Sequence, residues 1–300
     1  MRVTQSMLSN NMLRNLSSSY SKMGVLQDQL NTGKKITRPS QDPVVAIKGI
    51  GYRTSLNKIE QYERNLGEAN NWLDSTDDAL DKVGSALQRV RELIIDASND
   101  SKTSDDRGKI AQEIEQLKLQ ILDLSNTKVG DKHIFSGTKT LSPLFNNNGT
   151  PPDYNADGFL IATGVNEKVS IEVNDGVKLE VNSTGASAFQ SINKMLNDLG
   201  DLLTTGATGT QISSMITEAD SNLNRVLAER SQIGARQNRV EMVADRISSQ
   251  NVIIQKQLSN NEDVDYEKAI TELITQESIH SAGLSVGARI IQQTLVDFLR

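Results

Sequence analysis

The residues of this sequence that could carry chemistry are few and widely scattered. Its two histidines, His133 and His280, fall in different predicted elements, and neither lies in an HExxH pattern. A metal or acid–base site on either one is therefore disfavoured against a solvated or packed imidazole. The chain has no cysteine, which excludes disulfides, thiol nucleophiles and zinc–thiolate sites.

Two short runs resemble binding loops only at first sight. Glu262, Asp263 and Asp265 could suggest a calcium loop, but the glycine and the bidentate glutamate of an EF-hand are missing, so we interpret them as a helix start. Residues 206–209 are rich in Gly and Thr but lack the following Lys-Ser/Thr of a phosphate loop. We therefore expect no catalytic residue, no metal and no cofactor, and an enzyme is the least favoured function.

The composition favours long helices over a globular core. Hydrophobic residues make up 36% of the 300 residues but aromatics only 4%, and the formal net charge is -6. An acidic chain is a poor partner for nucleic acid. Since no apolar run approaches the roughly 18 residues of a membrane span, we expect no membrane partner. Residues 1–31 lack the apolar stretch of a cleaved secretory signal.

The longest periodic pattern predicts a helical rod that packs along a second long helix. Apolar seam positions alternate in steps of four and three, which averages 3.5 residues. They are Ile212, Ile216, Ala219, Leu223, Val226, Arg230, Ile233, Gln237, Val240, Ala244, Ile247, Asn251, Ile254 and Leu258. Such a helix is roughly 70 Å long at about 1.5 Å per residue, so an elongated molecule is expected. The polar members Arg230, Gln237 and Asn251 either fix the register or lie where the bundle is thin.

Other segments supply partners for this rod. A helix should begin at Asp42-Pro43 and continue to about Asn99, with an apolar residue at every seventh position from Leu66 to Ile94. A polar turn at 99–106 and a third helix to about 128 complete an αα-hairpin. Residues 130–185 are β-rich, with a strand at 132–136, a loop at 146–153 and an Asp-Gly hairpin at 169–181. Helical spacing returns at 189–203.

The two ends carry matching narrow apolar stripes and should lie side by side. These stripes contain too little apolar surface to order the ends alone, so we expect them to fold when neighbouring subunits cover them. The predicted assembly stripe consists of Met12, Leu16, Met23, Leu26, Leu30, Ile270, Ile274, Leu284, Ala288, Ile291, Leu295 and Phe298.

These patterns predict a mainly α fold, an elongated bundle of long antiparallel coiled-coil-like helices with a small β-rich insertion. Residues 1–42 with 262–300 form a terminal helical assembly domain in this division. Residues 43–129 with 186–261 form an α-helical rod domain, and residues 130–185 form the small β-rich domain.

Several segments resemble bacterial flagellins. Leu87–Leu93, Arg230–Val240 and Glu262–Tyr266 are similar to stretches of the helical regions of that family. Leu30–Ala46, with Arg38-Pro39 and Asp42-Pro43, and Ala282–Leu299 resemble the branch of the family at the hook–filament junction.

The resemblance implies a structural axial protein of the bacterial flagellum that joins hook to filament. It would polymerise through its terminal helices into a ring or short helical assembly, beside a neighbouring hook-associated protein and flagellin. It would be extracellular, exported by the flagellar type III apparatus after binding a cytosolic export chaperone, and this setting suits a chain without cysteine. Two alternatives stay open: a filament flagellin, which would form long polymers alone, and a soluble coiled-coil signalling module, which would be a cytosolic dimer.

Overall fold

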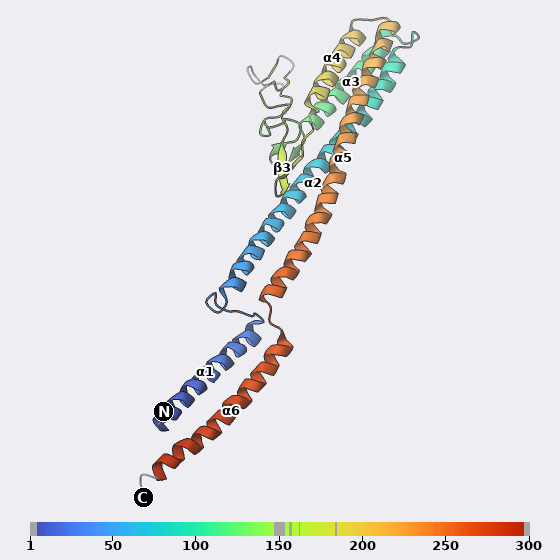
Figure 1. Ribbon diagram of the computed structural model, residues 1–300. Helices are drawn as coiled ribbons and strands as arrows, with labels where there is room; N and C mark the ends of the chain where they lie inside the picture. Colours follow the sequence, from blue (N-terminus) through green and yellow to red (C-terminus); the bar gives the residue numbers. More distant parts are fainter. Residues whose placement is uncertain (1–4, 147–153, 156–157, 162, 184, 297–300) are drawn as a thin grey trace. The chain divides into compact units, whose positions relative to one another are not determined.

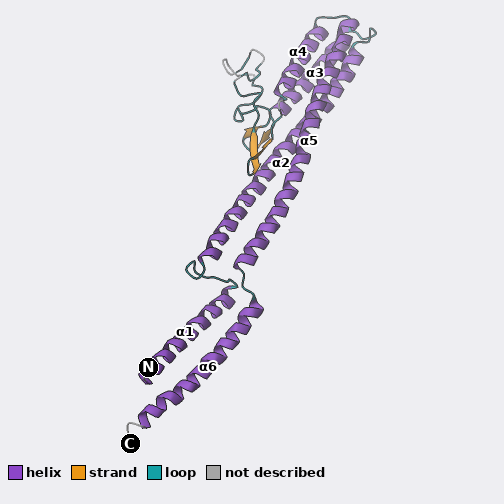
Figure 2. Cartoon of the chain, in the orientation of Figure 1, coloured by secondary structure: helices purple, strands orange, loops and turns teal. Residues whose placement is uncertain are grey.

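The computed structural model describes residues 5–146, 154–155, 158–161, 163–183 and 185–296, with only the backbone at 5–6 and 289–296. Helices dominate this part of the chain, as Figure 2 shows by colour, and the prediction of a mainly α fold is confirmed. The elements are α1 (Gln5–Thr32), α2 (Pro43–Ala97), α3 (Ser104–Ser125), β1 (Lys128–Val129), β2 (Lys132–His133), β3 (Ser170–Asn174), β4 (Val177–Glu180), α4 (Ala186–Thr204), α5 (Gly209–Glu262) and α6 (Tyr266–Val296) (Figure 1).

The chain divides into two compact units. One consists of Met1–Lys58 and Ser249–Arg300, and the other consists of Ile59–Ser248. We call them the terminal unit and the central unit. The predicted three-domain division, with boundaries at 42/43 and 261/262, remains a prediction. None of the described helices combines the length and the apolar content that a membrane crossing requires.

The core of the central unit follows the predicted heptad rows. Every seventh residue of α2 from Leu66 to Ile94 is buried, and so is the adjacent row of Trp72, Ala79, Ala86 and Leu93. The seam of α5 also faces inward in this unit, with Ile212, Val226 and Ile233 among its buried members. Helices α3 and α4 lie side by side and bury Ile114 and Phe189. Continuous apolar stripes on long helices therefore replace the single large core of a globular domain.

Two of the three polar seam positions of α5, Arg230 and Gln237, bond to acidic residues of α2. Nε and Nη2 of Arg230 donate to the two carboxylate oxygens of Asp77 at 3.0 and 3.1 Å, and its Nη1 donates to Asp81 at 2.5 Å. Nε2 of Gln237 donates to Asp74 Oδ1 at 2.8 Å. These bonds favour a role for Arg230 and Gln237 in fixing the register of the two helices.

Helix starts follow local capping chemistry. Asp42 Oδ1 accepts from the backbone N–H groups of Val44 and Val45, as expected for the start of α2. Helix α3 begins at Ser104, inside the predicted polar turn, because Thr103 and Asp106 form a capping box. Helix α5 ends at Glu262, so the break that we predicted at 259–265 starts later in the structure than in the prediction.

The β-rich segment packs on the helices of the central unit. The hairpin is confirmed: β3 pairs with β4 across Asp175-Gly176, and Gly176 has a φ of 71°. The predicted strand at 132–136 is wrong beyond His133. Only residues 132–133 pair with β1, and the next residues, Ile134 and Phe135, instead bury their side chains in the core. Phe135 makes an edge-on ring contact with Phe189 of α4 at 4.8 Å. The predicted loop at 146–153 lies, beyond Asn146, outside the described residues.

Candidate assembly interface

Helices α1 and α6 of the terminal unit lie side by side and antiparallel, as predicted (Figure 1). Their facing residues are less exposed than the rest of each helix, and on both helices they are spaced alternately by four and three. On α1 they are Met12, Leu16, Ser19, Met23, Leu26 and Leu30, and on α6 they are Ala269, Leu273, Gln276, His280, Gly283 and Gly287. We call these two rows the inner faces.

Glycines of α6 let the two helices approach closely at one end. A Cβ on Gly283 would lie 3.1 Å from Leu16 Cδ2, and a Cβ on Gly287 would lie 3.1 Å from Met12 Sδ. A step of four residues along α6 therefore matches a step of four along α1 in the opposite direction. Because glycine adds no side chain, this end of the pair gains close contact but buries little apolar surface.

The middle of the pair is polar. Nε2 of Gln276 donates to Ser19 Oγ at 2.6 Å, and the rings of Tyr20 and His280 lie 6.2 Å apart. Nδ1 of His280 is buried and has no hydrogen-bond partner among the described residues. Burying polar groups stabilises a helix pair less than burying apolar ones, so the inner faces alone hold α1 and α6 weakly.

The two histidines do not form a site. His133 lies in the central unit, where its Nδ1–H is placed to donate to the Asn126 carbonyl at 2.9 Å, and burial lowers the pKa of its imidazole. His280 lies in the terminal unit. Within the described residues, no three His, Asp or Glu side chains are close enough to hold a metal ion together.

The predicted assembly stripe divides between two faces. The α1 members Met12, Leu16, Met23, Leu26 and Leu30 belong to the inner face. The α6 members Ile270, Ile274 and Leu284 do not face α1, because they lie one position beyond the inner row, and they are 47%, 57% and 52% exposed. Ala288 is also exposed. Phe298 and the side chains of Ile291 and Leu295 lie outside the described residues.

Helix α6 therefore presents an apolar row to its surroundings. Ile270, Ile274 and Leu284 follow the same four-three repeat as Glu277 and Ser281, which complete the row. We call this row the outer face of α6. Large apolar side chains exposed along one row of a helix are typical of an interaction surface.

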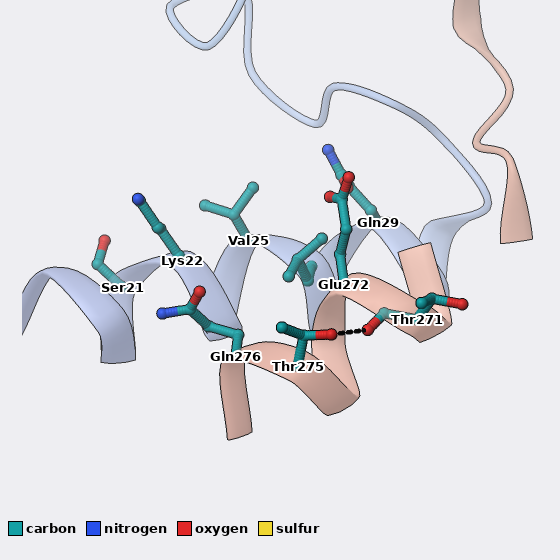
Figure 3. A pocket seen from close by; sticks show the side chains of 9 residues that line it. Ser21, Lys22, Val25, Gln29, Thr271, Glu272, Thr275 and Gln276 are labelled. Atoms are coloured by element: carbon teal, nitrogen blue, oxygen red, sulfur yellow. Dashed lines mark hydrogen bonds between the residues drawn. The ribbon is translucent and has the colours of Figure 1, made fainter. Parts of the chain in front are cut away.

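A groove of about 520 Å³ lies between α1 and α6 on one side of the pair (Figure 3). Val25, Leu26 and Gln29 line it from α1, and Thr271 and Thr275 line it from α6. The groove has the amphipathic lining of a surface that packs against another helix. Its lining shows no convergent acid, base and nucleophile that would suggest catalysis.

The chain crosses between helices at a compact cluster in the terminal unit, which we call the clasp. Backbone N–H groups of Lys35 and Val264 donate to the carbonyls of Glu262 and Gly33 at 2.6 and 2.9 Å. Gly33 has a φ of 69°, which ends α1 and turns the chain toward this contact. Glu262 is buried and accepts from Arg53 at 2.7 Å, since Gly49 leaves room for its carboxylate.

Charge pairing reinforces the clasp. Lys34 Nζ donates to Asp263 Oδ1 at 2.7 Å and lies 3.7 Å from Glu262 Oε2. The hydrogen bond to Asp263 raises the pKa of Lys34, and the same bond, with a second one from Ser259, lowers the pKa of Asp263. The sequence analysis missed this cluster, because its partners are more than 200 positions apart. Of the acidic run, Asp265 does serve as a helix start, accepting from the Lys268 N–H at 3.2 Å.

Comparisons with known proteins match both helical regions of the chain. The bacterial flagellin N-terminal helical region matches residues 3–140, and the bacterial flagellin C-terminal helical region matches residues 216–299. Flagellar hook-associated protein 3 of Salmonella typhimurium is 24% identical over 93% of each chain. Flagellin of Bacillus subtilis is 25% identical over 98% of this chain and 97% of its own.

A solved structure shares the fold. Flagellar hook-associated protein-3 from Legionella pneumophila superposes with a TM-score of 0.62 at 17% identity, covering 70% of this chain and 97% of that protein. The two flagellin regions together span most of the sequence and include α1, α2, α3, α6 and most of α5. This chain belongs to the bacterial flagellin family, whose members are structural proteins of the flagellum.

Proposed function

We propose that this chain is a structural axial protein that joins the flagellar hook to the filament. The observation that carries the proposal is the exposure of Ile270, Ile274 and Leu284 on the outer face of α6. The inner face of this helix instead includes Gln276, which bonds to Ser19, and glycines that bury little apolar surface. A helix pair with such an inner face gains most of its stability from neighbours that cover it. A structurally similar protein from Legionella pneumophila is named a flagellar junction protein, which supports the junction role over other axial positions.

The stripe residues have two roles in this proposal. Those of α1 hold the helix pair together, and those of α6 pack against neighbouring subunits in a ring or short helical assembly. Residues 1–42 with 262–300 serve as the assembly domain, and the role is mechanical, not catalytic. A second hook-associated protein and flagellin are the neighbours at the two ends of the assembly.

Export precedes assembly. The chain is exported by the flagellar type III apparatus, and a cytosolic chaperone covers the outer face of α6 until then. Leaving that face bare in the cytosol would favour premature association through its apolar residues.

A filament flagellin is the second candidate, and the match to the Bacillus subtilis flagellin, at similar identity, favours it. The two functions differ in what the pure chain does: a filament flagellin forms long polymers alone, and a junction protein does not. The coiled-coil signalling module is disfavoured, because the flagellin match extends over both helical regions.

Gene deletion in the source bacterium tests the proposal. Cells without the gene should build hooks but no filaments and should shed flagellin into the medium. Restoring the gene with Ile270→Ser, Ile274→Ser and Leu284→Ser together should not restore filaments. The matched control replaces the exposed Leu141, Ile161 and Met242 of the central unit with Ser and should restore swimming. Normal filaments in the deletion strain would refute the junction role.

A further inference from the structure

Two segments of the terminal unit carry opposite charge. Residues 33–58 contain six basic residues and one acidic residue, whereas residues 262–277 contain six acidic residues and one basic residue. The clasp uses Lys34, Arg53, Glu262 and Asp263. The other charged side chains of these segments are mostly exposed, so each segment presents charge of one sign to its surroundings.

The basic segment presents an apolar helix face that the sequence analysis did not identify. Val44, Ile47 and Ile50 are 60%, 69% and 63% exposed, and they lie on the side of α2 opposite Gly49, which faces Glu262. Gly51 lies on the same side, and a Cβ there would meet nothing within 4 Å. A glycine inside a helix is less favourable than alanine, and no contact within the described chain uses the space that Gly51 leaves. We call this side the α2 face.

The α2 face is flanked by charge. Lys48 and Lys58 are both exposed: Lys48 is next to Ile47, and Lys58 lies on the same side of the helix, about two turns beyond Ile50. The outer face of α6 carries the opposite charge: exposed Glu267 lies one turn before Ile270, and exposed Glu277 of the row itself lies one turn after Ile274. Both faces are thus short apolar rows of about two to three helical turns, one with a basic border and the other with an acidic border.

We propose that the α2 face of one copy docks on the outer face of α6, between about Ile270 and Glu277, in a second copy of this chain. This inference rests on the proposed function, because it names a contact that polymerisation needs. The charge signs make the contact head-to-tail: each face repels its own kind and attracts the other. A head-to-tail contact repeats from copy to copy and so generates a ring or a helical assembly instead of a closed dimer.

The absence of cysteine allows a direct test by disulfide cross-linking of the full chain. Two single substitutions, Ile47→Cys and Ile274→Cys, are made in separate preparations, which are then mixed and oxidised. Any cross-link between them joins two molecules. The mixed cross-link should form about tenfold faster than either self-cross-link, and faster than any cross-link to Met242→Cys, an exposed control in the central unit.

Charge reversal tests the specificity of the contact. Lys48→Glu with Lys58→Glu on the Ile47→Cys chain should slow the mixed cross-link about tenfold, and high salt should slow the unmodified pair. Glu267→Lys with Glu277→Lys on the Ile274→Cys chain should also slow the mixed cross-link about tenfold when the Ile47→Cys chain keeps its lysines. The two reversed chains mixed together should recover most of the original rate, which a general loss of folding could not produce.

Three results would overturn the inference: self-cross-links of Ile274→Cys that outpace the mixed one, mixed cross-links no faster than those to Met242→Cys, or no recovery in the doubly reversed mixture. Sedimentation of the same samples separates this outcome from failure of the proposed function. Chains that assemble without the mixed cross-link refute the contact and leave the junction role standing. Filaments that form normally in the deletion strain refute the junction role itself.

Discussion

Replacing Arg230 with Gln should destabilise the central unit measurably. Arg230 bonds to both oxygens of Asp77 and to Asp81, and its side chain and that of Asp77 are each about one-third exposed. Asp74 and Asp78 lie on the same two turns of α2, so loss of the cation also leaves four carboxylates close together. Partly exposed pairs contribute about 0.2–1 kcal/mol each, so two pairs and the added repulsion give a loss of about 1–2 kcal/mol.

Thermal unfolding of purified variants measures this loss. A unit of this size should lose about 2–4 °C in melting temperature per kcal/mol, so Arg230→Gln should melt about 2–8 °C lower. The melting temperature of Arg230→Lys should lie between those of the unchanged chain and Arg230→Gln, because lysine keeps the charge but cannot make the bidentate hydrogen bonds to Asp77. Arg246→Gln, at an exposed position of the same helix, is the control and should change little. An unchanged melting temperature, or a loss undiminished by high salt, would refute the ion-pair reasoning.

Three further predictions concern local features. Thr103→Ala removes the hydroxyl of the capping box and should cost the central unit about 1 kcal/mol in chemical denaturation. Burial holds the pKa of His133 below 6.5 in the folded chain. As the pH falls, His133 of the unfolded chain therefore binds a proton before His133 of the folded chain does. The free energy of unfolding should fall as pH drops below about 6.5, and a His133→Gln chain should show a flatter pH profile. Gly287→Leu should collide with Met12 and fail to restore filaments in deletion cells, whereas Gly67→Leu, at an open exposed site of the central unit, should restore them.

Regular periodicity was enough to predict the long helices. The α2 heptads from Leu66 to Ile94 are buried in the central unit, and the α5 seam there alternates between buried and half-buried residues. The prediction works because every third or fourth residue of a helix faces the same neighbour. Asp42-Pro43 and Asp175-Gly176 likewise specify a helix start and a hairpin turn through local backbone chemistry.

The faces of the end helices could not be assigned from hydrophobicity. On α6 the apolar row of Ile270, Ile274 and Leu284 suggested the contact with α1, but Gly283 and Gly287 make that contact because they allow a closer approach. An apolar pattern therefore does not show whether a row of α6 faces α1 or the surroundings, and the assembly role of this row stays a prediction. The exposed α2 face escaped notice for the same reason, since it has no partner within the described chain.

Local sequence patterns could not predict the clasp. Glu262 contacts Lys34 and Arg53 across more than 200 positions, and its burial depends on the space beside Gly49. The acidic run was interpreted by itself, so the matching basic segment at 33–58 was not connected with it. Comparing the charge signs of segments that the helical pairing brings together would have found the cluster.

Amide hydrogen exchange of the terminal unit, in the dilute monomer and in the assembled state, measures whether α1 and α6 become stable only when other subunits cover them. Amides from Met12 to Leu26 and from Ala269 to Gly287 should exchange nearly unprotected in the monomer and slow by orders of magnitude on assembly, while those of α2 near Leu73 and Leu80 stay protected in both. Strong protection of the terminal helices in the dilute monomer would contradict the account.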